Sequence, residues 1–234
     1  MEYTVDQKRA IDGVLSIFET GKIPSLSSFS TCTILSDGAG ISYGVHQSTD
    51  RSNSLDSIVK RYIELGGTYA AQLQPFLPYL AANKSAAEPP KGVWSQETKT
   101  LISVLKAAGS DPKMQIAQSD VFDRDYFMPA VNISKQIGLT KALSLLVVYD
   151  TCIHSGSGGV GNIRSRFPEA SPANGGEEKA WVKAYINARR SWLSGNNNPL
   201  VQRCVYRQDA MLELIKADNW DLVLPFSCRG VKIY

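Results

Sequence analysis

Long apolar segments are absent from this sequence. No stretch approaches the roughly 18 consecutive apolar residues of a membrane-spanning helix, so we expect no membrane span. The first ten residues, MEYTVDQKRA, contain no basic segment followed by an apolar one and do not match a secretory signal peptide. We therefore expect a chain that is made in the cytoplasm and needs another route if it acts outside the cell.

Metal-binding patterns are also scarce. The two histidines, His46 and His154, are far apart, and no CxxC pair occurs among the four cysteines at positions 32, 152, 204 and 228. We therefore expect no zinc site, no other metal and no cofactor. Cys152 lies in an apolar segment, where a cysteine behaves as a small core residue. A disulfide that involves Cys204 or Cys228 stays open.

Charge is nearly balanced and is not clustered. The chain has 25 Lys and Arg against 22 Asp and Glu, a net charge of +3, and no run of five like charges. Proteins dedicated to nucleic acids usually carry a denser basic patch, so we expect no nucleic-acid partner. With 234 residues the chain is long enough to bury a core without disulfides or metal ions. We expect one domain of two lobes, and a monomer.

The N-terminal pattern predicts a helix that ends at an acid. Thr4-Val5-Asp6-Gln7 fits a capping box, and apolar residues then follow at helical spacing up to Phe18. Gly21 and Pro24 end this helix. Glu19 therefore lies at its C-terminal end, beside Phe18, where we expect its carboxyl to be desolvated and uncharged.

Residues 30–45 have a different pattern. The run from Ser30 to Leu35 is β-branched and partly alternating, a turn follows at Asp37-Gly38-Ala39-Gly40, and a second strand is expected from Ile41 to Val45. Elsewhere we expect helices at 55–66, 69–80, 94–108, 139–153, 177–193 and 202–217, one or two helices within 112–137, and a Gly- and Pro-rich loop at 155–176. Because no βαβ alternation appears, we predict an α+β, mainly α fold with one small antiparallel sheet.

Two carboxylates, Glu19 and Asp37, frame this predicted sheet. Hydrolysis of a glycosidic bond needs such a pair, one acid protonated to donate to the leaving oxygen and the other ionised. Spacing alone leaves an alternative open, in which Glu19 is a solvated helix-end residue and Asp37 a turn former, because a chain with 22 acids offers many pairs.

Several ordered blocks resemble the chitosanases of glycoside hydrolase family 46. Residues 16–19 and 37–44 are similar to the helix-end glutamate and DGxGxTxG-type turn of that family, and further blocks follow at 122–131, 142–150, 158–164 and 187–190. The resemblance spans roughly residues 8–222. It implies that residues 1–234 form a single lysozyme-like catalytic domain, in which two helical lobes flank a cleft beside the small sheet.

The resemblance also implies roles for single residues. It makes the protein an inverting glycosidase, with Glu19 as general acid and Asp37 as general base. Ser42 aligns with a family threonine that helps to hold the attacking water, and it keeps the hydroxyl. Tyr43 lies within the turn motif and His46 just after it, so both are candidates for sugar contacts; alternatively, His46 is a solvated loop histidine.

Charged residues also fall on apolar helical faces. Asp150 continues a face of leucines, and Arg189 continues a face of aliphatic and aromatic residues. A charge in such a place is costly unless it is paired. The resemblance places Asp150, Arg189 and Arg207 in a buried ion network behind the acids, with Arg203 as an alternative to Arg207. Such a network either supports the two lobes or also tunes Glu19.

One position departs from the family pattern. Where the family has an aspartate that contacts the free amine of the substrate, this chain has Ser54, with Asp50 and Asp56 nearby as substitutes. Together with the positive net charge, this change favours bacterial peptidoglycan over chitosan. We therefore expect a muramidase-like lytic enzyme that reaches the cell wall after phage lysis or specialised secretion. A chitosanase and a non-catalytic glycan-binding protein are the alternatives.

Weaker signals remain. Residues 156–161 formally match GxGxxG, but no strand precedes them and prolines follow, so a loop is expected there rather than a nucleotide site. His154 has serines nearby but no GxSxG elbow, which argues against a serine hydrolase. The four tryptophans could stack on sugar rings, but helical spacing favours a core position for most of them. They are Trp94, Trp181, Trp192 and Trp220.

Overall fold

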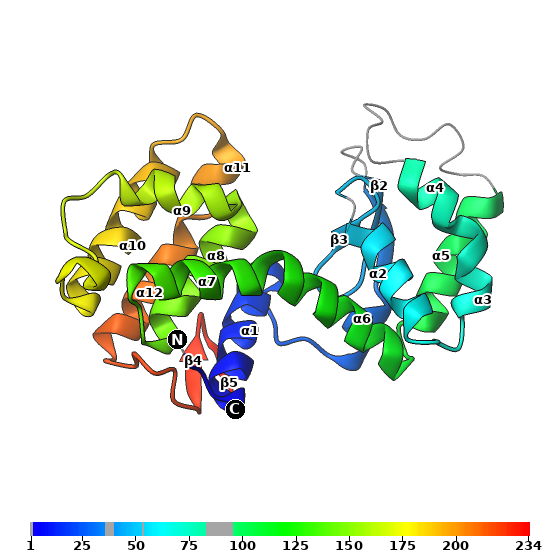
Figure 1. The fold of residues 1–234 in the computed structure, drawn as a ribbon, viewed down its shortest axis with the longest axis horizontal. Coiled ribbons are helices and arrows are strands. Elements are labelled where there is room, and N and C mark those ends of the chain that lie inside the picture. Colours follow the sequence, from blue (N-terminus) through cyan, green and yellow to red (C-terminus); the bar gives the residue numbers. More distant parts are fainter. Residues whose placement is uncertain (1, 36–39, 53, 83–95) are drawn as a thin grey trace. The chain divides into compact units, whose positions relative to one another are not determined.

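The computed structural model describes residues 2–35, 40–52, 54–82 and 96–234. The chain divides into two compact units. Unit 1 combines two separate segments, Met1–Ile23 and Asp125–Tyr234, and unit 2 is the continuous segment Pro24–Arg124 (Figure 1). Within the described ranges, no helix has the length and apolar character that crossing a membrane would require.

Unit 1 is built from helices and one short hairpin. Its elements are α1 (Val5–Thr20), α7 (Met128–Ile137), α8 (Ala142–Ser155), α9 (Ser157–Arg164), η5 (Pro172–Asn174), α10 (Glu178–Ser194), α11 (Pro199–Gln202), α12 (Val205–Lys216), β4 (Phe226–Cys228) and β5 (Val231–Ile233). Strands β4 and β5 pair antiparallel.

The first helix begins and ends as the sequence predicts. Thr4 Oγ1 accepts from the backbone N–H of Gln7 at 3.1 Å, and Gln7 Oε1 accepts from the backbone N–H of Thr4 at 2.9 Å, which completes a capping box. At the other end Gly21 adopts a left-handed conformation with φ 74°, and its N–H donates to the carbonyl of Ile17. These two caps fix where α1 stops and therefore where Glu19 lies.

Helix α8 is the centre of unit 1. Every residue from Ala142 to Cys152 is buried, as expected for a helix that is apolar on all sides. It packs against α1, α7, α9, α10 and α12, several of which surround it in Figure 1. The buried position of Cys152 confirms the core role predicted for it. Asp150 lies on this helix, so its carboxylate is carried into the middle of the unit.

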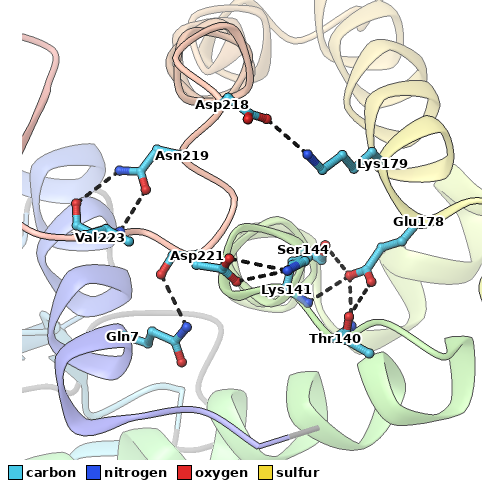
Figure 2. Close-up of polar contacts among 10 residues, drawn as sticks. All are labelled: Gln7, Thr140, Lys141, Ser144, Glu178, Lys179, Asp218, Asn219, Asp221 and Val223. Carbon is cyan, nitrogen blue, oxygen red and sulfur yellow. Dashed lines mark hydrogen bonds and ion pairs between the residues drawn. The ribbon is translucent and has the colours of Figure 1, made fainter.

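A polar network fixes the N-terminal end of α8. The carboxylate of Glu178, at the start of α10, accepts from the backbone N–H groups of Thr140 and Lys141 at 2.8 and 2.9 Å, and from Ser144 Oγ at 2.7 Å (Figure 2). These two N–H groups precede the first turn of α8, so Glu178 holds the chain just before the helix, while Ser144 lies within it. The contact ties the start of α8 to the start of α10.

Unit 2 holds the larger sheet and the remaining helices. Its elements are η1 (Leu26–Ser30), β1 (Cys32–Leu35), β2 (Gly40–Tyr43), β3 (Ser48–Thr49), α2 (Ser54–Glu64), α3 (Ala70–Leu73), η2 (Gln74–Phe76), α4 (Leu77–Ala82), α5 (Gln96–Ala108) and α6 (Pro112–Phe122). A π-helical turn, η4 (Asp123–Phe127), follows α6 and contains the boundary between the units.

The sheet of unit 2 is antiparallel, in the order β1-β2-β3. In the register of β1 and β2, Thr33 pairs with Ser42 and Leu35 with Gly40. Gly40 has φ 80°, and a Cβ atom there would lie 1.9 Å from Asp50 Oδ1. Only glycine therefore fits at the start of β2. The apolar side chains of this sheet pack with α2, α5 and α6 into the core of the unit.

The predicted fold class is confirmed: the chain is mainly helical with a small antiparallel sheet. One local prediction differs from the structure, and one element was not predicted. The loop expected at 155–176 contains helix α9, and the GxGxxG pattern lies at the start of that helix without a preceding strand. The region 112–137, where one or two helices were expected, contains two, α6 and α7, with η4 between them and Pro129 in the first turn of α7. The β4–β5 hairpin has no counterpart in the prediction. All four cysteines are free thiols.

Candidate functional site

Glu19 lies in the last turn of α1, next to a firmly held residue. Phe18 is buried, its backbone carbonyl accepts from the hydroxyl of Tyr206 at 2.5 Å, and the two rings meet edge to face with centroids 6.1 Å apart. Tyr206 on α12 therefore fixes the backbone from which the Glu19 side chain projects. The sequence analysis missed Tyr206, since nothing but its place beside Arg207 distinguishes it from other half-buried tyrosines.

Arg207 joins Glu19 to Asp150. Its Nη2 donates to Glu19 Oε1 at 2.5 Å and its Nη1 donates to Asp150 Oδ1 at 2.7 Å. The guanidinium is almost entirely buried, and it also lies over the ring of Phe18 at 5.6 Å from the centroid. One rigid, planar cation therefore contacts both carboxylates, an arrangement that suits arginine and that a lysine ammonium does not reproduce.

Arg189 completes the cluster from α10. It is fully buried, and its Nη1 donates to the second carboxylate oxygen, Asp150 Oδ2. The structure thus brings together all four residues that the sequence grouped, Glu19, Asp150, Arg189 and Arg207, in one connected set within unit 1. Arg203, the alternative to Arg207, is exposed.

The buried charges stabilise one another. Burial alone would raise the pKa of Asp150, but the charges of Arg189 and Arg207 outweigh it and hold that pKa below its ordinary value. Burial would lower the pKa of Arg207, but Asp150 and Glu19 outweigh it and raise that pKa. The cluster contains two carboxylates and two guanidinium groups, so each buried charge has a counter-ion.

The surroundings of Glu19 differ from the prediction. We expected an apolar environment beside Phe18, but the Glu19 side chain is 46% exposed and lies against the Arg207 cation. The reason is local: Phe18 points into the core of unit 1, while the next residue of the helix, about 100° further round, faces solvent and α12. The desolvation expected for Glu19 was therefore wrong.

His154 is a further titratable group near this cluster. It is half-buried in the last turn of α8, and its Nδ1 lies 3.3 Å from Ser155 Oγ. Burial lowers its pKa, and the charges of Arg189 and Arg207 lower it further. The pKa of His154 therefore lies below the ordinary value of a histidine, which favours the neutral imidazole.

The other predicted residues belong to unit 2. Asp37, the expected base, and Trp94 lie outside the described residues. Ser42 is in β2, fully buried, and its hydroxyl donates to Gln47 Oε1 at 2.9 Å. The lone pairs of that hydroxyl remain as acceptors, so Ser42 can accept a hydrogen bond from a water molecule, while its own hydrogen is used in the bond to Gln47.

Tyr43 and His46 have different surroundings. Tyr43 is fully buried in the core of unit 2, and its hydroxyl donates to the backbone carbonyl of Leu105 at 2.7 Å. The predicted sugar contact of Tyr43 was therefore wrong, because alternation along β2 turns this side chain inward. His46 is exposed and stacks on Phe122 with centroids 3.6 Å apart, which leaves it a candidate for sugar contact.

Ser54 and its acidic neighbours hold the loop before α2. Ser54 Oγ accepts from the backbone N–H of Thr49 at 3.2 Å. Asp50 is fully buried and accepts from the backbone N–H of Ile41 at 3.1 Å. Asp56 is also buried and pairs with Lys60 at 2.9 Å. Neither aspartate therefore offers an exposed carboxylate, so the predicted substitution of Asp50 or Asp56 for the family aspartate was wrong.

Comparison with known proteins agrees with this arrangement. The family model described as Glycosyl hydrolase family 46 matches residues 13–226. A chitosanase of Bacillus subtilis strain 168 is 27% identical over 96% of this chain and 82% of its own. Among solved structures, native chitosanase from Bacillus subtilis MY002 has a TM-score of 0.82 at 24% identity, with 99% of each chain covered. The GH46 chitosanase of Gynuella sunshinyii, solved with chitotetraose, has a TM-score of 0.80 at 26% identity, with 99% of this chain and 98% of that chain covered.

These likenesses correct the expected substrate. Each of these relatives is a chitosanase, and nothing in the likenesses supports the predicted preference for peptidoglycan or a lytic role. Because the family model covers nearly the whole chain, residues 13–226, the non-catalytic alternative is also disfavoured. The fold is the lysozyme-like fold of the chitosanases. This chain belongs to glycosyl hydrolase family 46 and is a glycosidase.

Proposed function

We propose that this protein is an endo-acting chitosanase that hydrolyses the β-1,4 bonds of chitosan with inversion. The family match over residues 13–226 carries this proposal. The names of the relatives support the substrate, since they are chitosanases and one was solved with chitotetraose. The net charge of +3 is small, and a cationic substrate depends on local carboxylates rather than on the overall balance.

In this proposal Glu19 is the general acid and Asp37 the general base. Glu19 donates its proton to the oxygen of the leaving sugar, and Asp37 takes a proton from the water that attacks the anomeric carbon from the opposite face. Ser42 helps to hold that water through the free lone pairs of its hydroxyl. Inversion at a β-linkage releases a new reducing end in the α configuration.

Arg207 acts as a positioning residue for the acid. Its two donors connect Glu19 Oε1 to Asp150 Oδ1, and Arg189 fixes Asp150 from the other side. Because all these side chains except Glu19 are buried, the carboxyl of Glu19 has one preferred orientation. Orientation of this kind is worth much in catalysis, since a misplacement of about 1 Å can cost about 10²-fold in rate.

Product analysis tests this function. Purified protein is incubated with chitosan and, separately, with peptidoglycan, and products are sized by mass spectrometry. We expect chitosan fragments of several sugars early in the reaction, as an endo-acting enzyme produces. Proton NMR of a chitotetraose digest should show the α anomer first. Release of the β anomer first would contradict inversion, and cleavage of peptidoglycan without cleavage of chitosan would overturn the proposed substrate.

Two variants test the acid and the base. Glu19→Gln and Asp37→Asn should each abolish turnover, because each keeps the shape of the side chain and loses its ability to exchange a proton. Glu2→Gln, which removes an exposed acid of the same unit, is the control and should keep full activity. Activity of Glu19→Gln close to that of the control would remove Glu19 from the mechanism.

A further inference from the structure

A pocket lies on unit 1, on a face of α10. Its volume is about 630 Å³, within the range of small-molecule sites. The segment 166–169 forms one wall. The floor and opposite wall come from α10 residues that recur every three or four positions, chief among them Ala184, Asn187, Ala188 and Trp192.

This pocket is separate from the set of charged residues that contains Glu19, Asp150, Arg189 and Arg207. Its residues on α10 lie on one stripe of the helix, whereas Arg189 projects roughly a third of a turn away, into the core of the unit. Neither Glu19, Asp150 nor Arg207 lines it. The pocket is therefore a different site on the same unit.

Its aromatic walls are preformed. The guanidinium of Arg164 lies 4.7 Å from the ring centroid of Phe167 and donates to its backbone carbonyl at 2.7 Å, while Trp181 packs edge to face against the same ring. Trp192 is half-buried, and within the described ranges its ring has no aromatic or cation–π partner and its indole N–H has no hydrogen-bond partner. A tryptophan in such a place offers an apolar face and one donor to a ligand.

The polar groups around the pocket differ in whether they already have a partner within the protein. Arg166 donates through Nε and Nη2 to Asn162 Oδ1, at 3.1 and 3.0 Å, which ties its guanidinium to α9. In the described part of the chain, the carboxylate of Glu169 has no ion pair and the amide of Asn187 no hydrogen bond. The pocket therefore combines an aromatic face, a donor, an amide and an unpaired carboxylate.

We infer that this pocket binds one glucosamine unit of a chitosan chain, as an auxiliary site outside the catalytic residues. An aromatic face packs against the apolar face of a sugar ring, the indole N–H and Asn187 amide pair with hydroxyls, and Glu169 pairs with the ammonium group. Arg166 lines the pocket as well, but its Nε and Nη2 are already bonded to Asn162, so Glu169 is the charged group left free for a ligand. A free carboxylate favours a cationic sugar over a neutral one. The choice of sugar rests on the proposed function, but the existence of the site does not.

An auxiliary site matters only for long substrates. A polymer that holds on at Glu169 and Trp192 is bound at two places, so its apparent affinity rises without any change in the chemical step. A short oligomer cannot use both sites at once. The pocket therefore affects the KM for polymeric chitosan and leaves kcat unchanged.

Binding can be measured at Trp192 directly. The protein is labelled with ¹⁵N at the tryptophan indoles, in the Glu19→Gln background to prevent turnover, and Trp192→Phe assigns the signal. Titration with chitotetraose should shift the Trp192 signal saturably. Glu169→Gln should weaken this binding about tenfold, since it removes a charge-assisted hydrogen bond, and the Glu2→Gln control should not weaken it. An N-acetylated tetramer should bind more weakly than chitotetraose.

The outcomes separate the pocket from the catalytic proposal. If the Trp192 signal stays still while wild-type protein cleaves chitosan, the pocket is not a sugar site. If the signal shifts but Glu169→Gln or N-acetylation has no effect, the assignment to a cationic sugar is wrong. If the signal shifts in the predicted way and no chitosan is cleaved, the pocket stands and the proposed function fails. In active protein, Glu169→Gln should raise the polymer KM several-fold and leave chitotetraose hydrolysis unchanged.

Discussion

Arg207 donates to Glu19 at 2.5 Å, although 188 positions separate the two residues in the sequence. The pair is completed by Asp150, which accepts from the other end of the same guanidinium at 2.7 Å. The acid at the end of α1 is thus held by a cation on α12, and that cation is held by an anion on α8. Disturbance at any of the three positions should reach Glu19.

Replacement of Arg207 should distinguish the effect of its positive charge from the effect of its bridge between two carboxylates. Arg207→Lys keeps the positive charge but cannot bridge two carboxylates, so we expect chitosan turnover to fall about 10²-fold with little change in KM. Steady-state kinetics on chitotetraose measure this split. Lys60→Arg, a change at a half-exposed ion pair of unit 2, is the control. Near-normal kcat in Arg207→Lys would show that charge alone is sufficient.

Replacement of Asp150 should change stability and its pH dependence. Asp150→Asn leaves the buried guanidinium of Arg189 without its anion and Arg207 with Glu19 alone, and it should cost about 3–5 kcal/mol. Because the folded-state pKa of Asp150 is held low, its ion pairs stabilise the native state above the ordinary pKa of about 3.9 and are lost as pH falls below it. Urea unfolding from pH 2 to 7 should therefore show a smaller acid loss in Asp150→Asn than in the wild type.

Glu178 should stabilise unit 1 through the start of α8. Glu178→Ala removes acceptors from two backbone N–H groups and the Ser144 hydroxyl, and we expect a loss of about 1–3 kcal/mol. The neighbouring Glu177→Ala removes only a local cap of α10 and should cost about 1 kcal/mol. Thermal unfolding of both variants compares them, and an equal loss would contradict the role of Glu178 as a link between two helices.

Thiol reactivity should single out one cysteine. Burial raises the pKa of Cys32 to about 12 and the pKa values of Cys152 and Cys228 to about 11, whereas Cys204 is only half-buried. Since the thiolate is the reactive form, one thiol per chain should react quickly with a disulfide reagent in native buffer, and four after unfolding. Cys204→Ser should remove the fast reaction. Persistence of that reaction in the variant would contradict this assignment.

The sequence predicted a feature correctly where that feature is determined within a single helix. The capping box at Thr4 and the stop at Gly21 placed α1 correctly because both act within a single turn of helix. The apolar stripe that contains Asp150 indicated a buried carboxylate for the same reason, since a charge on such a face needs a partner.

Tertiary packing decided the features that the sequence did not reveal. Helix α9 contains three glycines, which local propensity assigns to a loop, but Gly159 lies against Thr151 and Ser155 of α8, where a Cβ atom would come within 2.7 Å of the Ser155 Cβ. Tyr43 lay in a functional motif, yet the partner that fixes its direction, Leu105, is 62 residues away. Similarly, the cation that lies against Glu19 is Arg207 of α12, 188 residues away.

Unit 1 is built from both ends of the chain, with unit 2 inserted between them, and this order has a consequence for biosynthesis. The continuous segment Pro24–Arg124 can close its core while the remainder is still being made, but α1 has to wait for residues 125–234. At 5–20 residues per second, the ribosome needs about 10–40 s to travel from Glu19 to Arg207. A nascent chain therefore carries its proposed proton donor without the cation that contacts it, and we expect hydrolytic competence only once the last long helix has emerged.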